Sequence, residues 1–357
     1  MAVLIFIVIL SLLVFVHEAG HFSIAKWAGM KVEEFGFGFP PRLFGVRRGE
    51  TEYSVNLIPL GGFVKIFGES GEHQDDPRSF ASRSKWKRFL VLIAGVAMNV
   101  LLAWVLLMGG FAVGLPTAVD EPLPGRPHIM DSSVQITYVL PDSSAADAGV
   151  ELGDRVLAVN GTSVLDAARA RELIGTVAEG ETLELTVECD GISRTLEMSP
   201  RQIENGQIAI GTQITTVGIV RYGFFDAVIQ GTNATVGLTA ATLQGFGMLI
   251  GRLVTGQGVS ADIAGPVGIA AMTGDVADLG WPYLIHFMAL LSINLAILNV
   301  IPFPALDGGR ILFLAIEAVR RKPVTAALER SVHGAGFALL ILLVILITYR
   351  DIAGLVG

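Results

Sequence analysis

The sequence has 357 residues, of which 52% are hydrophobic and only 16% are charged. Soluble domains usually carry about a quarter charged residues, so this composition indicates a membrane protein with a soluble portion. The net charge of −8 argues against nucleic acid as a partner, and the single cysteine excludes both an internal disulfide and a cysteine-based metal cage.

Residues 1–24 contain the first expected membrane helix, at 2–24. The apolar run is long enough to span a bilayer, and it lacks the basic start and cleavage site of a signal peptide. Its second half contains HEAGH, in which His17 and His21 share one helical face and can reach one metal ion, with Glu18 beside them as a general base. Ionisable side chains are rare inside a membrane unless they have a function, which favours a zinc site over two structural histidines.

Residues 25–88 are expected to form a cytoplasmic β region associated with the membrane. Alternating runs at 34–39 and 53–58, separated by turn residues, predict β-hairpins. The many glycines and aromatic residues suit a sheet that lies against the bilayer. On pattern alone, an ordinary cytoplasmic loop is equally compatible.

A second membrane helix is predicted at 89–114, with Gly95 allowing close helix packing and Asn99 in a structural role. Residues 115–205 are expected to form a β-rich domain, and 206–280 a linker outside the membrane. We interpret 224–256 within this linker as an amphipathic helix on the outer face, because its Thr, Asn and Gln content disfavours a fifth span.

A third membrane helix at 281–302 runs into the irregular stretch NVIPFPALDGGR, within the segment 281–310. Broken backbone at membrane depth is tolerated only where it is buried in protein or lines a wet cavity. Asp307 in this stretch is the best candidate for a third zinc ligand, ahead of Glu33 and Glu34, although taken alone it could be a helix N-cap.

Two amides in the third helix, Asn294 and Asn299, either make interhelical hydrogen bonds or hold a substrate backbone and the reaction's oxyanion. The last segment, 311–357, is cytoplasmic at its start and contains a fourth membrane helix at 333–349. His333 in that helix is isolated from other ligands, which favours packing over metal binding.

The distribution of charge predicts the topology. Residues 25–88 contain eleven Lys and Arg, and 303–330 contain five basic and three acidic residues, whereas 115–280 contain eight basic and twenty acidic residues. By the positive-inside rule, the first two segments are cytoplasmic and the third is outside. The active site is therefore expected toward the cytoplasmic side.

These motifs, in this order, resemble the site-2 protease family of intramembrane zinc metalloproteases. The resemblance covers HEAGH at 17–21, AGVAMN at 94–99, AGPVGIA at 264–270 and SINLAILNVIPFPALDGGR at 292–310. The stretch PDSSAADAGVELGDRVLAVNG at 141–161 resembles the core of a bacterial PDZ domain. One such domain between the second and third spans is similar to the RseP-type branch of the family.

The resemblance implies a multi-pass protein of the bacterial inner membrane, with about four transmembrane helices, the cytoplasmic β-hairpin region and one extracytoplasmic PDZ domain. It implies a zinc metalloendopeptidase in regulated intramembrane proteolysis, which hydrolyses peptide bonds within the membrane segments of pre-cleaved single-pass proteins such as anti-sigma factors or remnant signal peptides. His17, His21 and Asp307 would bind Zn²⁺, Glu18 would act as general base and acid, and Asn294 and Asn299 would contact substrate.

The implied partners are the lipid bilayer, an extended substrate added to the edge of the hairpin region, and a peptide or protein ligand of the PDZ domain. The alternative is a catalytically silent membrane scaffold that binds partners through its PDZ domain. The intact Glu18 favours the enzyme, because a silent relative commonly loses the base or a ligand. A zinc transporter is a weaker alternative, because only one ligand cluster is visible.

Overall fold

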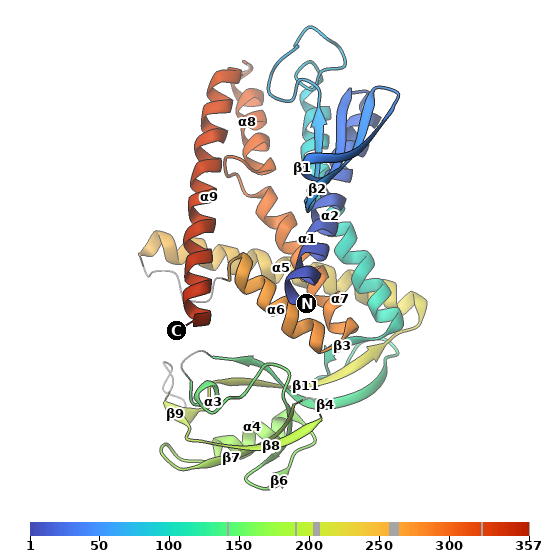
Figure 1. Cartoon of the computed structure of the whole chain (residues 1–357). Coiled ribbons are helices and arrows are strands. Elements are labelled where there is room, and N and C mark those ends of the chain that lie inside the picture. The colour runs from blue at the N-terminus through green and yellow to red at the C-terminus, as the bar shows by residue number, and fades with distance from the viewer. Residues whose placement is uncertain (141–142, 190, 203–207, 257–263, 323, 357) are drawn as a thin grey trace. The chain divides into compact units, whose positions relative to one another are not determined.

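The computed structural model describes residues 1–140, 143–189, 191–202, 208–256, 264–322 and 324–356 (Figure 1). The chain forms two compact units, one made of 1–107, 231–278 and 287–357, and the other of 108–230 and 279–286. The first two residues of the PDZ-like stretch, Pro141 and Asp142, lie outside the described residues, as do 203–207 and 257–263 of the expected β-rich domain and linker.

The helices in the described part of the chain are α1 (Ala2–Trp27), α2 (Lys85–Val113), α3 (Ser144–Asp147), α4 (Ala167–Gly175), α5 (Phe224–Thr255), α6 (Pro266–Asp278), α7 (Trp281–Val300), α8 (Asp307–Arg320) and α9 (Ala326–Val356). The strands are β1 (Val32–Arg48), β2 (Thr51–Ile66), β3 (Leu115–Ala118), β4 (His128–Val139), β5 (Arg155–Val159), β6 (Thr162–Ser163), β7 (Leu183–Cys189), β8 (Ile192–Met198), β9 (Arg201–Gln202), β10 (Ile208–Ala209) and β11 (Thr212–Arg221).

Within these residues, five helices are long and apolar enough to cross a membrane: α1, α2, α5, α7 and α9. Four of them overlap the predicted spans, and α5 is the segment for which the sequence favours an amphipathic surface helix. Its mean hydropathy of 1.3 is the lowest of the five. Two of its threonines form hydrogen bonds within the helix: the Thr235 hydroxyl donates to the carbonyl of Gly231, and the Thr239 hydroxyl donates to the carbonyl of Thr235, both at 2.7 Å. These hydroxyls therefore need no water or neighbouring helix as a hydrogen-bond partner. How many of the five helices cross a bilayer stays a prediction.

The predicted β-hairpins are present in the first unit as the long antiparallel strands β1 and β2 (Figure 1). The start of β1 pairs with both ends of β2, because Phe35 lies opposite Tyr53 and also opposite Val64. Residues 62–66 of β2 consequently form an outer strand. Rings join this sheet to α1, with Phe35 4.8 Å from Phe22 and 5.3 Å from Phe15 between centroids.

A shared apolar core fixes the sheet, α1, α2 and α8 together. Its buried members are Ala25, Ala28, Met30, Val32, Ile66, Phe80, Val91, Leu92 and Leu314. A partly buried ion pair extends this packing, because Arg88 of α2 lies 2.8 Å from Glu317 of α8. The first unit therefore holds the ends of α1, α2 and α8 in fixed positions, which the candidate site requires.

The second unit is built on a seven-stranded sheet with the order β3-β11-β4-β5-β7-β8, with β6 paired to β5. Its core is aliphatic and includes Ile136, Val159, Leu183, Leu185 and Val187. The strand β11 pairs with both β3 and β4, so the sheet continues past residue 205, the boundary expected from the sequence. The expected linker 206–280 thus contains an interior strand of the sheet, β11, as well as helices α5 and α6.

Candidate metal centre

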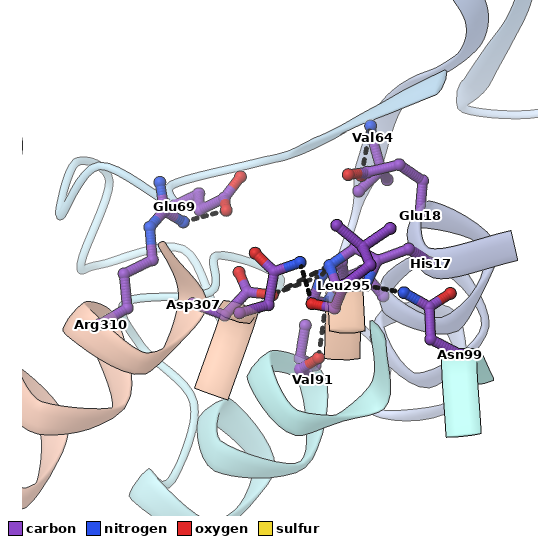
Figure 2. A network of polar contacts seen from close by, with 11 residues as sticks. His17, Glu18, Val64, Glu69, Val91, Asn99, Leu295, Asp307 and Arg310 are labelled. Atoms are coloured by element: carbon purple, nitrogen blue, oxygen red, sulfur yellow. Dashed lines mark hydrogen bonds and ion pairs between the residues drawn. The ribbon is translucent and has the colours of Figure 1, made fainter. Parts of the chain in front are cut away.

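Two histidines of α1 and an aspartate at the start of α8 meet at one point in the first unit (Figure 2). His17 Nε2 lies 3.0 Å from Asp307 Oδ2, and His21 Nε2 lies 3.2 Å from the same oxygen. The two Nε2 atoms are 3.2 Å apart. The three atoms thus form a nearly equilateral triangle, in which both histidines are buried and Asp307 is partly buried.

The size and chemistry of this triangle fit zinc. Ligands placed tetrahedrally at ~2.1 Å from Zn²⁺ lie about 3.4 Å from one another, close to the observed separations. Imidazole nitrogen and carboxylate oxygen are ordinary zinc ligands, and three protein ligands leave the fourth position open, as in catalytic sites.

Hydrogen bonds at the opposite ring nitrogens orient both imidazoles. His21 Nδ1 lies 2.7 Å from the carbonyl oxygen of Val91, which can only accept, so Nδ1 carries the proton and Nε2 keeps its lone pair. His17 Nδ1 lies 3.2 Å from the side-chain amide of Asn99, whose Oδ1 is buried without a partner in the described part of the chain. An amide turned to accept from Nδ1–H through Oδ1 gives His17 the same tautomer, with Nε2 ready for a metal.

A tight turn between α7 and α8 presents Asp307. The glycines of LDGG permit it, because a Cβ at Gly308 would collide with the carbonyl oxygens of Val300 and Ile301, and one at Gly309 with that of Phe303. Zinc binds the deprotonated carboxylate, so Asp307 would act as an ionised ligand.

Helix α2 closes the site from another side, and its close approach depends on Gly95. A Cβ at Gly95 would lie 2.6 Å from His17 Nε2 and from His21 Nε2. The close packing expected at Gly95 is thus confirmed, and its partner is the pair of imidazoles itself. Asn99, one helical turn further along α2, reaches the far side of His17 from the same face.

Glu18 lies beside the histidines and faces the sheet. Its Oε2 accepts a hydrogen bond from the backbone N–H of Val64, at 3.1 Å, in the outer strand formed by 62–66 (Figure 2). One carboxylate oxygen is thus held by the strand. Near Asp307, the side chain of Arg310 pairs with Glu69, which ties α8 to the segment that follows β2.

The other residues singled out from the sequence do not belong to this cluster of three ligands. Glu33 pairs with Lys65 at 2.9 Å and Glu34 with Arg42 at 3.2 Å, and neither rival ligand is part of the cluster. Asn299 donates to the carbonyl of Leu295 at 3.0 Å, within its own helix, and in the described residues the Asn294 side chain has no hydrogen bond. A substrate role for these two amides stays a prediction.

Two contacts of the site were not predicted from the sequence. One is the bond between Asn99 and His17, for which the spacing of Gly95 and Asn99 on one helical face was the available signal. The other is the bond between Val64 and Glu18, which uses a backbone group and leaves no trace in residue types.

Comparison with known proteins identifies the family. The family model described as Peptidase family M50 matches residues 5–343. The chain belongs to peptidase family M50. The prediction of a zinc metalloprotease of the site-2 protease family is thereby confirmed. With its five long apolar helices, this M50 member is a membrane protein.

Relatives of this M50 chain match over nearly their whole length. A Clostridium perfringens protein is 36% identical over 343 residues, 96% of each chain. Zinc metalloprotease RasP of Geobacillus kaustophilus is 32% identical, with 97% of this chain and 96% of that protein covered. Zinc metalloprotease RasP of Bacillus licheniformis is 31% identical, with 98% of each covered.

Among solved structures, the PDZ domain of an SdrC-like protein from Listeria innocua matches with 18% identity, covering 23% of this chain and 92% of that chain. The TM-score of this match is 0.22.

Proposed function

We propose that this M50 peptidase hydrolyses peptide bonds within the membrane segments of single-pass proteins, in regulated intramembrane proteolysis. The observation that carries the proposal is the convergence of His17, His21 and Asp307 next to Glu18, inside a unit rich in long apolar helices. A water-dependent reaction at such a place suits a substrate that is itself a membrane helix. Substrates already clipped outside the membrane, such as anti-sigma factors or remnant signal peptides, are the proposed class.

His17, His21 and Asp307 are the proposed zinc ligands, and their donor atoms and spacing fit that ion. When bound, zinc supplies a Lewis acid that polarises the scissile carbonyl and makes water more acidic. Val91 and Asn99 orient the two imidazoles, so that both Nε2 lone pairs point to the same place. Gly95 keeps α2 against the rings, which limits the space open to solvent.

Glu18 is the proposed general base and acid. Because Oε2 is held by the N–H of Val64, Oε1 is the atom assigned to take the proton from the attacking water. The water oxygen bonds to the scissile carbonyl carbon, and the proton then passes from Glu18 to the leaving nitrogen as the C–N bond breaks. Asn294 and Asn299 remain the proposed contacts for the substrate backbone.

A substrate in extended form can pair with the outer strand 62–66. That strand already borders Glu18, and an added strand would bring a backbone carbonyl next to the general base. Extension also exposes a peptide bond that a helix would shield. The exposed apolar side chains of the sheet, among them Phe39, Leu43, Phe44, Leu57 and Leu60, support a hairpin region in contact with lipid.

The distribution of charge supports an inner-membrane protein with 25–88 and 303–330 in the cytoplasm and the second unit outside. In this arrangement the active site lies toward the cytoplasmic side. The second unit is proposed to be a single PDZ domain that binds a peptide or protein, on the strength of the stretch at 141–161.

A cleavage assay tests the proposal. The Glu18→Gln variant is compared with the wild type on a reporter helix in proteoliposomes, together with Glu33→Gln as a matched change of a carboxylate that pairs with Lys65. Loss of a general base lowers the rate by about 10²–10⁴-fold, so cleavage by Glu18→Gln falls to background while zinc content stays unchanged. Equal cleavage by Glu18→Gln and the wild type would refute the assignment.

A further inference from the structure

The turn that carries Asp307 has an unfavourable backbone conformation. Ala305 has a φ of +84°, and non-glycine residues with positive φ are uncommon because Cβ crowds the backbone. Such a conformation persists only where surrounding contacts enforce it. Asp307 follows two residues later, so the contacts that enforce Ala305 also place the third ligand.

One enforcing contact comes from α9. The backbone N–H of Ala305 donates to His333 Nδ1 at 2.9 Å. This bond fixes the tautomer of His333, with its proton on Nε2, and Nε2 has no hydrogen-bond partner in the described residues. The ring of Phe313, in α8, lies 5.4 Å from the imidazole and holds it in place.

A second contact comes from Gly336, almost one helical turn after His333 in α9. A Cβ on Gly336 would lie 2.6 Å from the carbonyl oxygen of Pro304, and it would also collide with the Pro304 side chain. Because Gly336 has no side chain, α9 lies directly against the residue before Ala305. At Gly334, on the same helix, a Cβ would meet no described atom within 4 Å.

We infer that the first turns of α9 form a clamp, made of His333 and Gly336, that positions Asp307 for the metal. The inference rests on the ligand set in the proposed function and adds two positioning residues to it. Neither residue touches the triangle, and both act through the backbone of 304–305.

Packing alone accounts poorly for a histidine at this place. An imidazole whose Nε2–H is buried without an acceptor in the described residues destabilises the fold, and a leucine of similar volume would avoid that loss. The one favourable polar contact that the ring makes in the described structure is with the strained turn. The hydrogen bond to Ala305 therefore explains the residue type, and it acts where the metal ligand is placed.

The first test compares two substitutions of His333 and measures zinc affinity by competition with a chelator on the full-length detergent-solubilised protein. Asn places its side-chain oxygen near the position of Nδ1, so the N–H of Ala305 keeps an acceptor. Gln places its side-chain oxygen near the position of Nε2, so the N–H of Ala305 loses its acceptor. We expect H333Q to weaken zinc binding about 10–100-fold, the range for groups that orient a ligand, and H333N to stay within about threefold of the wild type.

The second test uses the two glycines of α9. Gly336→Ala and Gly334→Ala raise helix propensity equally, but only the first pushes Pro304 away. We expect weaker zinc binding for Gly336→Ala alone. Because positive φ costs glycine nothing, adding Ala305→Gly to H333Q should recover most of the lost affinity.

Wild-type zinc affinity in both H333Q and Gly336→Ala would overturn the inference, as would equal losses in Gly336→Ala and Gly334→Ala. Failure of Ala305→Gly to rescue H333Q would refute the role of backbone strain. These tests measure zinc binding and do not depend on proteolysis. A wild-type protein that binds zinc but cleaves no reporter would refute the proposed proteolysis, while the zinc affinities of the variants would still decide whether the clamp exists.

Discussion

The two halves of the metal centre are presented in different ways. His17 and His21 lie on an unbroken helix of 26 residues, where spacing alone puts both imidazoles on one face. Asp307 lies at the end of a broken connection that needs two glycines, a strained alanine and a neighbouring helix to hold it. The first half is local and regular, while the second depends on contacts between distant segments.

The contrast between the two halves shows where the metal centre is vulnerable to substitution. A regular helix keeps its ligands in place through its own hydrogen bonds, so changes near His17 and His21 act mainly through direct collision or lost orientation. The turn also depends on contacts from α9, so its ligand can be lost through changes in residues that never approach the metal. Substitutions in each half test that contrast.

Removal of a ligand from either half should abolish tight zinc binding. We expect His17→Ala and Asp307→Ala each to weaken zinc binding by more than about a hundredfold, beyond the effect of losing an orienting partner. Metal analysis after gel filtration measures this, with His286→Ala in α7 as the control. Stoichiometric zinc in Asp307→Ala would remove the turn from the site and end the comparison.

Overpacking at the helical half should have the next largest effect. Gly95→Ala puts a methyl group 2.6 Å from both Nε2 atoms, and overpacking typically costs 1–3 kcal/mol, which corresponds to about 5–150-fold in zinc affinity. Gly109→Ala in the same helix meets nothing within 4 Å and should bind zinc like the wild type. Equal affinity in the two variants would show that α2 can move away at no cost.

The same contrast decides what the sequence could predict. HEAGH specified its own geometry, and the alternating runs predicted the β1–β2 sheet. Asp307 could be proposed as a ligand because it lies in irregular backbone next to a membrane helix. The residues that support its turn could not be predicted, because Ala305, His333 and Gly336 meet only after the chain has folded. The outer strand's bond to Glu18 was equally invisible, since any residue but proline supplies a backbone N–H.

Loss of the Asn99 amide, which orients His17, should lower zinc affinity less than the largest effect expected from overpacking at Gly95. Asn99→Ala removes the partner of His17 Nδ1, and we expect zinc affinity to fall about tenfold, the lower end for such partners. Asn99→Asp keeps an oxygen that can accept from Nδ1–H and should bind zinc more tightly than Asn99→Ala. The reverse order in a chelator titration would contradict the assigned tautomer of His17.

The smallest effect is expected at the far end of α9. Asp351 Oδ1 and Oδ2 accept from the N–H groups of Gly265 and Gly268, at 3.2 and 2.8 Å, and so cap the start of α6. Asp351→Ala should lower the free energy of unfolding by about 1 kcal/mol, as loss of a helix cap does, and a thermal-denaturation series with Tyr349→Phe as the control measures it.

Zinc affinity in Asp351→Ala should equal that of the wild type, because the clamp on Asp307 is confined to the first turns of α9. The Asp351 cap and the clamp share one helix, so this variant separates loss of the helix's attachment from loss of the turn's support. If Asp351→Ala weakened zinc binding as much as Gly336→Ala, α9 would act on the metal centre as a whole helix, and His333 and Gly336 would hold no special place within it.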